Sequence, residues 1–212
     1  MTDALVLHGY FRSSASYRVR IALNLKGIVY TDAFHHLRRG EQRAPAFLAL
    51  NPQGLLPALE TPHGVLPQSL AICDYLDAIV PTPPLLPADP FRRAQVRAFA
   101  LAIACDIHPL QNLTVLARLR AAGLGEDLVT GWARDVIDSG LAACATLIAD
   151  SDGPYCFGAE VTLADLCLIP QMANARRFGA RTDWPRLEAI EAACHALPAF
   201  DAASPERQAD AE

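Results

Sequence analysis

Two serines stand beside three arginines in the segment FRSSASYRVRIAL, residues 11–23, which has the composition of a loop running into a helix. Unpaired backbone N–H groups and the positive end of a helix dipole meet at such a helix start, so an anion placed there is stabilised. A protein that supplied its own thiolate would need a cysteine here, but the sequence has Ser13, Ser14 and Ala15. Any thiolate must therefore come from a ligand. The simpler alternative is that Ser13 or Ser14 only caps the helix.

A second pair of motifs suits a small peptide ligand. LLPAL, residues 55–59, places a proline where an extended segment begins. QS, residues 68–69, stands at the start of another predicted helix, with Ser69 as its expected cap. The main chain of a peptide could pair with Leu56 along an open strand edge, while its terminal carboxylate lies at the helix start beside Ser69. Together these motifs favour ligand binding over helix capping alone.

The secondary structure around these motifs can be predicted from the pattern of apolar residues. Residues 4–80 alternate short apolar runs with segments of helical periodicity, which is typical of an α/β unit. We expect a strand at 4–10, a helix at 16–26 ended by Gly27, and a strand at 28–34. A short helix ending at Asn51 should follow. The last three expected elements are a strand containing Pro57, a strand at 63–66 and a helix at 68–80. Pro57 is expected on a sheet edge or in a special turn. This order predicts a thioredoxin-like fold.

The second half of the chain has a different pattern of apolar residues. Five prolines within residues 81–90 mark a linker, because neither a helix nor a central strand accommodates them. Beyond the linker, apolar residues recur every three or four positions, which predicts helices at 91–120, 126–149, 162–178 and 184–196. The predicted organisation is a thioredoxin-like domain at 1–82, a linker at 83–90, an all-helical domain at 91–205 and a flexible tail at 206–212.

Composition and charge exclude several classes of protein. The net charge is −5, and 17 arginines and one lysine are spread along the chain, so no nucleic-acid partner is expected. No apolar run approaches the roughly 20 residues that span a bilayer, and no secretory signal is recognisable, so no membrane partner and a cytoplasmic location are expected. The six cysteines lie singly in apolar segments without metal-ligand spacing. We expect them to be reduced core residues, with no bound metal.

The chain resembles the zeta class of glutathione transferases, which includes glutathione-dependent isomerases of maleylacetoacetate and of maleylpyruvate. The resemblance runs over nearly the whole length and rests on YFRSSASYRVRIALNLKG, LNPQGLLPALET, QSLAICDYLD, PTPPLLPADP, CDIHPLQNLTVL, VTLADLCLIPQMANARRF and the late AF. It implies the glutathione transferase fold, in which an α/β thioredoxin-like domain precedes an all-α helical bundle. It also implies glutathione as cofactor and a homodimer.

The resemblance gives the paired serines a role. Ser13 is implied to hydrogen-bond the glutathione sulfur, with Ser14 as the alternative residue. The family motif SSCS reads SSAS here, because Ala15 replaces the cysteine. This difference puts a role for that cysteine in doubt and leaves the serine mechanism intact.

The remaining glutathione contacts are also implied by the resemblance. Leu56, which precedes a proline that is cis in the family (Pro57), is expected to pair with the cysteinyl main chain. Gln68 and Ser69 are expected to hold the γ-glutamyl end. Gln42 is expected to contact the glycyl end.

The motif CDIHPLQN, residues 105–112, carries a second polar cluster near an expected helix break. Asp106 and His108 are two positions apart, so on a helix they point about 200° apart and do not favour a metal. In the family these positions and Asn112 are similar to residues near the glutathione, which implies a polar lining of the site. Leu113 stands where some maleylpyruvate isomerases have an arginine, which favours maleylacetoacetate as the substrate.

Two further local patterns carry expectations. Thr162 and Asp165 have the spacing of a reciprocal helix cap, in which each side chain bonds the backbone of the other. His35 and His36 are expected on a solvated loop without a role in the site.

The reaction implied by the resemblance is a cis–trans isomerisation of a conjugated double bond. Addition of the thiolate moves charge onto the neighbouring carbonyl and permits rotation, and loss of the thiolate regenerates glutathione. Arg12 and Arg177 are the expected clamps for a small dicarboxylate substrate, because arginine meets a carboxylate with two parallel N–H groups. Arg176 is expected to be a solvated surface charge.

Two alternatives to the isomerase remain open. One is a zeta-class transferase that conjugates or dehalogenates small electrophiles and consumes glutathione. The other is a non-catalytic protein of the same fold, against which the intact SS, QS and LLP motifs argue.

Overall fold

The computed structural model describes residues 5–212, and the chain divides into two compact units. The first unit comprises Met1–Leu85 together with Ala196–Glu212, and the second comprises Leu86–His195.

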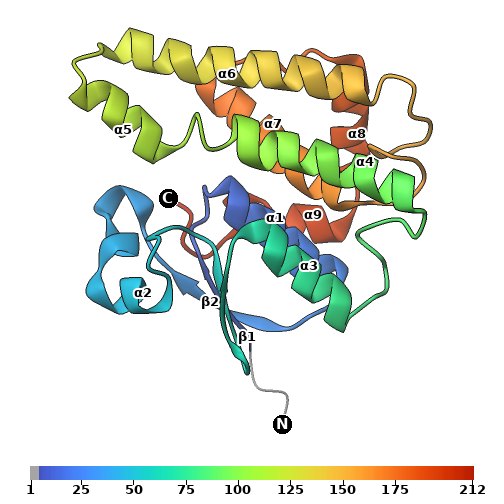
Figure 1. Cartoon of the computed structure of the whole chain (residues 1–212), viewed down its shortest axis with the longest axis horizontal. Coiled ribbons are helices and arrows are strands. Elements are labelled where there is room, and N and C mark those ends of the chain that lie inside the picture. Colours follow the sequence, from blue (N-terminus) through green and yellow to red (C-terminus); the bar gives the residue numbers. More distant parts are fainter. Residues whose placement is uncertain (1–4) are drawn as a thin grey trace. The chain divides into compact units, whose positions relative to one another are not determined.

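The first unit is built on a mixed sheet of four strands in the order β2-β1-β3-β4 (Figure 1). Strand β1 pairs in parallel with β2 and antiparallel with β3, which pairs antiparallel with β4. The elements in chain order are β1 (Leu5–Gly9), α1 (Ser14–Leu25), β2 (Tyr30–Phe34), η1 (Leu37–Arg39), η2 (Glu41–Arg43), α2 (Pro45–Leu50), β3 (Ala58–Thr61), β4 (Gly64–Pro67) and α3 (Ser69–Ile79). The predicted thioredoxin-like order is confirmed.

Helix α1 is the central helix of this unit. Every residue from Ser14 to Leu23 is buried, and α1 packs against both α3 and the C-terminal helix α9. Lys26 caps the helix, and Gly27 follows with a φ of 62°, a left-handed conformation that glycine adopts without a steric penalty. On the opposite face of the sheet, Phe47 of α2 packs against His8 of β1.

Pro57 does not lie in an edge strand. Strand β3 begins one residue later, at Ala58, and is hydrogen-bonded on both sides, to β1 and to β4. The Leu56–Pro57 peptide bond is cis, so the alternative expectation of a special turn is the correct one. The proline is tolerated because it precedes the ladder and therefore removes no donor from it.

The C-terminal residues belong to the first unit, which corrects the expectation that residues 196–205 belong to the helical domain. Helix α9 (Pro198–Ala203) and the short η4 (Pro205–Arg207) follow one another here. Tyr17 donates a hydrogen bond to the carbonyl of Phe200, and Asn24 donates one to the carbonyl of Ala199 at 3.1 Å. Both donors lie on α1, so the side chains of α1 hold the returning chain.

The segment expected to be a flexible tail makes polar contacts in the structure. Residues 206–212 lie against the first unit, where Glu212 pairs with both His36 and Arg39. The Asp210 carboxylate accepts a hydrogen bond from the backbone N–H of Phe11 at 3.0 Å. Polar contacts therefore hold this segment against the rest of the first unit.

The second unit is helical throughout its described elements, as predicted. These elements are α4 (Pro90–Leu101), η3 (Ala102–Ile107), α5 (Leu113–Ala121), α6 (Glu126–Leu147), α7 (Leu163–Phe178) and α8 (Pro185–His195). The helical stretch expected at 91–120 is interrupted near Pro109, as predicted, and the interruption consists of a π-helical segment, η3, and a turn that separate α4 from α5. A side chain at Gly140 on α6 would meet Ile107 at 2.4 Å, so this glycine permits close packing on η3.

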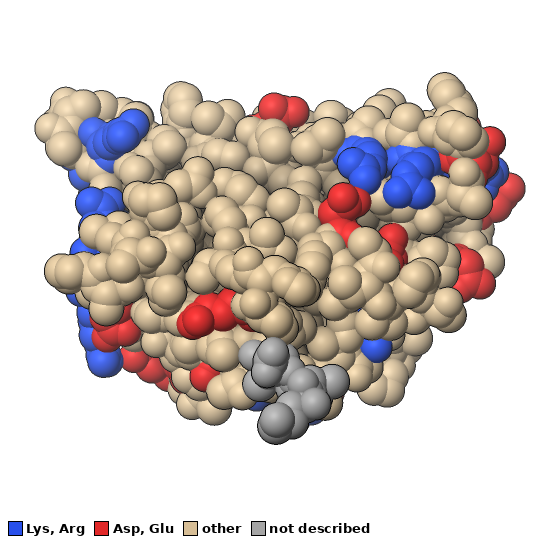
Figure 2. All heavy atoms as spheres, turned by 60° about the horizontal axis from the view of Figure 1, so that its bottom comes forward, with Lys and Arg blue, Asp and Glu red and all other residues tan. Residues whose placement is uncertain are grey.

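Most cysteines are core residues, as expected, but Cys105 is exposed on η3. Burial raises the pKa of the Cys144 thiol to about 12, so this thiol is protonated at neutral pH. Charged side chains are scattered over the face drawn in Figure 2, among many uncharged ones. Within residues 5–212, each helix is too short or too polar to cross a membrane.

Candidate active site

Ser13 is the N-cap of α1, directly before the first helical residue, Ser14. As the N-cap it has extended backbone angles, and its Oγ accepts a hydrogen bond from the N–H of Ser16 at 3.2 Å. The capping alternative is therefore confirmed as the structural role of Ser13. It does not exclude a second role, because an oxygen that accepts a bond can still donate its own hydrogen. Ser13 is partly exposed whereas Ser14 is buried, so Ser13 is the hydroxyl that a ligand can reach.

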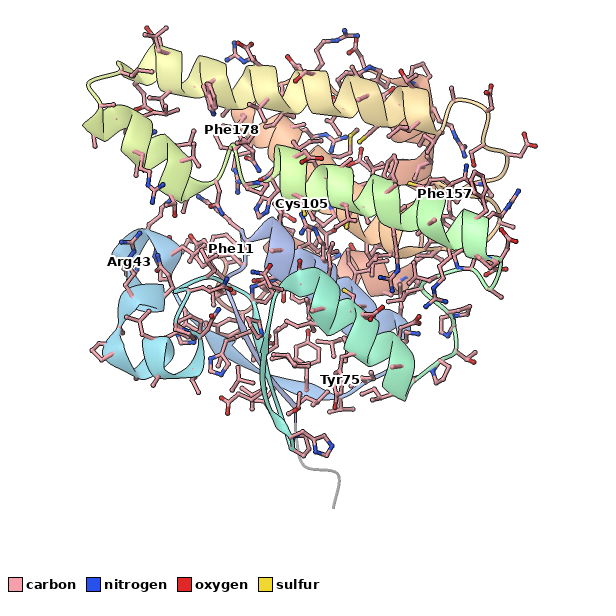
Figure 3. The ribbon with its side chains drawn as sticks, viewed as in Figure 1. Phe11, Arg43, Tyr75, Cys105, Phe157 and Phe178 are labelled. Atoms are coloured by element: carbon pink, nitrogen blue, oxygen red, sulfur yellow. The ribbon has the colours of Figure 1, made fainter. Side chains whose placement is uncertain are left out.

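Arg12 precedes Ser13 in the loop between β1 and α1. Its guanidinium lies 4.9 Å from the centre of the Phe11 ring, a cation–π contact that orients a partly exposed charge. The Phe11 side chain is buried and lies near the start of α1 (Figure 3). Arg12 and Ser13 are thus adjacent cationic and hydroxyl groups on one short loop.

Ser69 does not cap α3, which corrects the expectation. It is the first residue of the helix, and Gln68 is the N-cap, without a side-chain hydrogen bond to the helix. Instead, the Ser69 hydroxyl accepts a hydrogen bond from Nη1 of Arg18 at 3.1 Å. The first backbone N–H groups of α3 therefore have no side-chain cap, and a buried cation lies beside them.

Arg18 is a buried cation next to Ser69 that the sequence pattern did not indicate. It is 1% exposed, and its Nε and Nη2 have no hydrogen-bond acceptor among residues 5–212. A buried charge without a partner is costly, so an anion next to Ser69 would offset that cost. The spacing of apolar residues could not indicate that Arg18 is buried, because an arginine in a helix is normally expected on the surface.

Gln68 has a backbone conformation that is unusual for its residue type. Its φ is 71°, and it is the only residue other than glycine with a positive φ among residues 5–212. Such conformations concentrate at ligand sites, where the surrounding structure enforces them. The side-chain Nε2 of Gln68 donates to Oε1 of Gln53 at 3.1 Å, so the exposed amide is also oriented.

Leu56 and Gln42 are the other predicted contacts in this unit. The ladders of β3 begin at Ala58, so the backbone of Leu56 precedes them both. Gln42 lies in η2, and its buried Oε1 has no hydrogen-bond partner within residues 5–212. The backbone of Leu56 lies outside the hydrogen-bonded ladders of the sheet, and the side-chain amide oxygen of Gln42 has no acceptor role in the described residues.

The two histidines expected on a solvated loop are partly buried and structured. Nε2 of His35 lies 2.8 Å from Nδ1 of His8, and Nε2 of His8 lies 2.5 Å from Oε1 of Glu60. Burial, with His8 as a further cause, lowers the pKa of His35. His36 packs edge-on against Tyr10 and pairs with Glu212. The expectation was wrong because the C-terminal segment and α2 cover this loop.

In the second unit, Arg177 and Arg176 differ in their surroundings. Arg176 forms a bidentate pair with Glu191, which is almost fully buried, so it is an ion-paired residue and not a free surface charge. Arg177 donates to Oδ1 of the buried Asn174, and its guanidinium lies 5.4 Å from the Phe178 ring. Asn174 thereby orients Arg177 from the preceding turn of α7.

The CDIHPLQN motif lies in η3 and the turn that follows. Asp106 is exposed, and the backbone N–H of His108 bonds the carbonyl of Ile103. Asn112 caps α5, and its side chain accepts a bond from the N–H of Leu113 at 2.6 Å. Asn112 therefore has a structural role in addition to the expected ligand contact. Segments of π-helix are often found at functional sites.

Comparisons with known proteins identify the family of the chain. A family model described as the N-terminal domain of glutathione S-transferases matches residues 7–84. The maleylacetoacetate isomerase of Pseudomonas aeruginosa is 48% identical, over 96% of this chain and 97% of that protein.

Two solved structures are also similar. One is a holo structure of a bacterial zeta-class maleylpyruvate isomerase, with a TM-score of 0.95 and 44% identity over 98% of this chain and 100% of that chain. The other is the maleylacetoacetate isomerase of Anaeromyxobacter dehalogenans with bound dicarboxyethyl glutathione and citrate, with a TM-score of 0.89 and 42% identity over 99% and 98% of the two chains.

Proposed function

Since the chain belongs to the zeta-class family of maleylacetoacetate and maleylpyruvate isomerases within the glutathione transferases, we propose that it isomerises maleylacetoacetate, or the closely related maleylpyruvate, to the fumaryl product. Glutathione is the proposed cofactor. When bound, it supplies a thiolate that adds reversibly to the cis double bond, so it is not consumed.

The residues of the first unit fit glutathione. Ser69 accepts its bond from Arg18, which leaves the hydroxyl hydrogen free to donate to the γ-glutamyl carboxylate. The uncapped start of α3 and the buried Arg18 charge favour an anion at the same place. Gln68 is proposed to orient the γ-glutamyl end, Leu56 to pair with the cysteinyl main chain, and Gln42 to contact the glycyl end.

The observation that carries the proposal is the position of Ser13. A partly exposed hydroxyl at the start of a 12-residue helix can donate to a thiolate, and the N–H of Ser16 polarises that hydroxyl. The helix dipole stabilises the same negative charge. Both effects lower the pKa of a bound thiol and raise the fraction of thiolate at neutral pH.

Arg12 and Arg177 are the proposed clamps for the substrate carboxylates. A neighbouring side chain orients each guanidinium. The Phe11 ring orients Arg12, and Asn174 orients Arg177. Orientation matters because a two-pronged contact requires the plane of the guanidinium to match the carboxylate. Asp106, His108 and Asn112 are proposed to line the polar part of the site.

We also propose a cytoplasmic homodimer, as the family resemblance implies. Sedimentation at micromolar protein concentration tests the oligomeric state. A species of about twice the chain mass of 22.8 kDa supports a dimer, and a single species at the chain mass contradicts it.

The function is tested by following the loss of each cis acid spectroscopically, with and without a catalytic amount of glutathione. Both acids contain the same alkene, so the proposal predicts glutathione-dependent isomerisation of at least one, with maleylacetoacetate preferred. Arg177→Lys keeps the charge but removes the two-pronged geometry, and it should raise the KM for the acid. If neither acid isomerises, the conjugating transferase becomes the better account.

A further inference from the structure

The loop that carries Arg12 and Ser13 is tied to the C-terminal segment through a buried arginine. Arg20 of α1 donates from Nη1 to the carbonyl of Tyr10 at 3.4 Å and from Nη2 to the carbonyl of Phe11 at 3.1 Å. Its Nε donates to the carbonyl of Ala203 at 2.9 Å. One planar group therefore joins the loop to the end of α9.

Asp210 holds the same loop from the other side. Its Oδ2 accepts the backbone N–H of Phe11 at 3.0 Å, so both the N–H and the carbonyl of Phe11 are engaged by side chains. The N–H of Ser13 bonds the carbonyl of Tyr10 at 3.0 Å and closes the turn. These bonds fix the peptide groups on both sides of Phe11. They thereby determine the backbone position of Arg12, the next residue.

The burial of Arg20 makes this arrangement costly. The residue is 2% exposed, and burial lowers its pKa to about 10, so it is still charged at neutral pH. An apolar side chain of similar volume would fill the space without the cost of desolvating a charge. An apolar side chain could not, however, hold the carbonyls of Tyr10, Phe11 and Ala203 at fixed positions by hydrogen bonds. Asp210 and Asp32 both favour the charged form.

We propose that Arg20 and Asp210 are positioning residues for the catalytic loop, so that the C-terminal segment is part of the catalytic apparatus. This inference rests on the proposed function of Ser13 and Arg12. Neither residue touches the reacting atoms. Both act through the backbone of Phe11, which places the Ser13 hydroxyl and the Arg12 guanidinium.

Asp210 is the better residue to change, because it is partly exposed near the chain end and its loss should leave the fold intact. Asp210→Ala removes the acceptor for the Phe11 N–H, whereas Asp210→Asn keeps an amide oxygen that can accept the same bond. Glu206→Gln is the matched control, since it removes one negative charge from an exposed position of the same segment.

The measurements are kcat, the KM for each reactant, the pKa of the enzyme-bound glutathione thiol from thiolate absorbance, and thermal unfolding. Asp210→Ala should lower kcat about tenfold or more and raise the bound-thiol pKa, because small displacements of catalytic groups have large effects on rate. Asp210→Asn should restore most of the rate, and Glu206→Gln should match the wild type.

Two results would overturn the inference. One is an Asp210→Ala enzyme that loses thermal stability but keeps its kcat and bound-thiol pKa. The other is an Asp210→Asn enzyme as impaired as Asp210→Ala, which would assign the effect to charge and not to the loop. If the wild type binds glutathione but isomerises neither acid, the proposed function fails, while the thiol pKa still tests the positioning.

Discussion

Arg18 donates a hydrogen bond to the hydroxyl of Ser69 at 3.1 Å, between two helices, in a buried environment. A guanidinium has no lone pair to offer, so Ser69 must be the acceptor and its hydrogen must point elsewhere. The contact therefore fixes the direction in which Ser69 can donate. It also brings a positive charge to the uncapped start of α3.

Replacing Arg18 with methionine should weaken glutathione binding with little effect on kcat at saturation. The bond to Ser69 and the local charge are lost, while an unbranched side chain still fills the space. Charge-assisted hydrogen bonds contribute about 1.5–3 kcal/mol, so the dissociation constant should rise about tenfold or more. Isothermal titration of glutathione measures the change.

The comparison variant for this prediction is Ser69→Ala. If the two residues act as one unit, the double variant should bind no worse than about the poorer single variant. Fully additive losses would show that Arg18 and Ser69 act independently.

Ser13→Ala should lower kcat far more than it weakens glutathione binding. The hydroxyl acts on the sulfur charge and not on the ends of the peptide, and losing one such donor costs roughly 3 kcal/mol, about 100-fold in rate. Steady-state kinetics at saturating glutathione provide the measurement.

Two variants separate catalysis from helix capping. Ser13→Gly keeps most of the N-cap stability but has no hydroxyl, so it should be stable and nearly inactive. Ser14→Ala should retain activity, because the Ser14 side chain is buried. A Ser13→Gly enzyme with normal activity would assign Ser13 to capping alone.

The sequence predicted the strand and helix order of the first unit well, because strand and helix periodicities are distinct there. It misplaced the C-terminal segment, since nothing in PAFDAASPERQADAE shows that α9 returns to pack on α1. It predicted a break near Pro109 within the helical stretch 91–120, but not that the break begins with the π-helical segment η3. Helical periodicity does not distinguish an α-helix from a π-helical insertion.

The sequence placed Ser13 at the start of a helix correctly, because a helix start is a local property. It missed Arg18 and Arg20, because periodicity arguments treat charged residues as solvated and α1 is buried on nearly all sides. It assigned Ser69 to capping, although the positive φ of Gln68 changes which residue is the N-cap. The burial of Arg18 and Arg20 and the bonding of Ser69 all depend on packing between segments that are distant in the sequence.

His35 should make stability depend on pH. Burial lowers its pKa, so near and below pH 6.5 the unfolded chain binds more protons at this residue than the folded protein does. The free energy of unfolding should therefore fall as the pH decreases from about 7 to about 5.5. In His35→Phe, urea unfolding should show a smaller decrease over this range. Parallel profiles for the two proteins would contradict the assignment.

Asp165 should be a large contributor to the stability of the second unit. It is fully buried, and its carboxylate accepts the N–H of Cys156 and the N–H of Thr162, each at 2.8 Å. The bond to Thr162 confirms the predicted return bond of the reciprocal cap. Asp165→Ala leaves two buried N–H groups unpaired and should cost about 3 kcal/mol or more in urea unfolding. Thr162→Ala should cost only about 1 kcal/mol, and equal losses would contradict this account.

The most direct test of the isomerase is the fate of glutathione over many turnovers. Enzyme, a limiting amount of glutathione and an excess of maleylacetoacetate are mixed, and free thiol and fumaryl product are measured together. An isomerase should form product in large excess over glutathione, and the free thiol should return to its starting amount when the acid is exhausted. A loss of thiol in proportion to product would contradict the isomerase function.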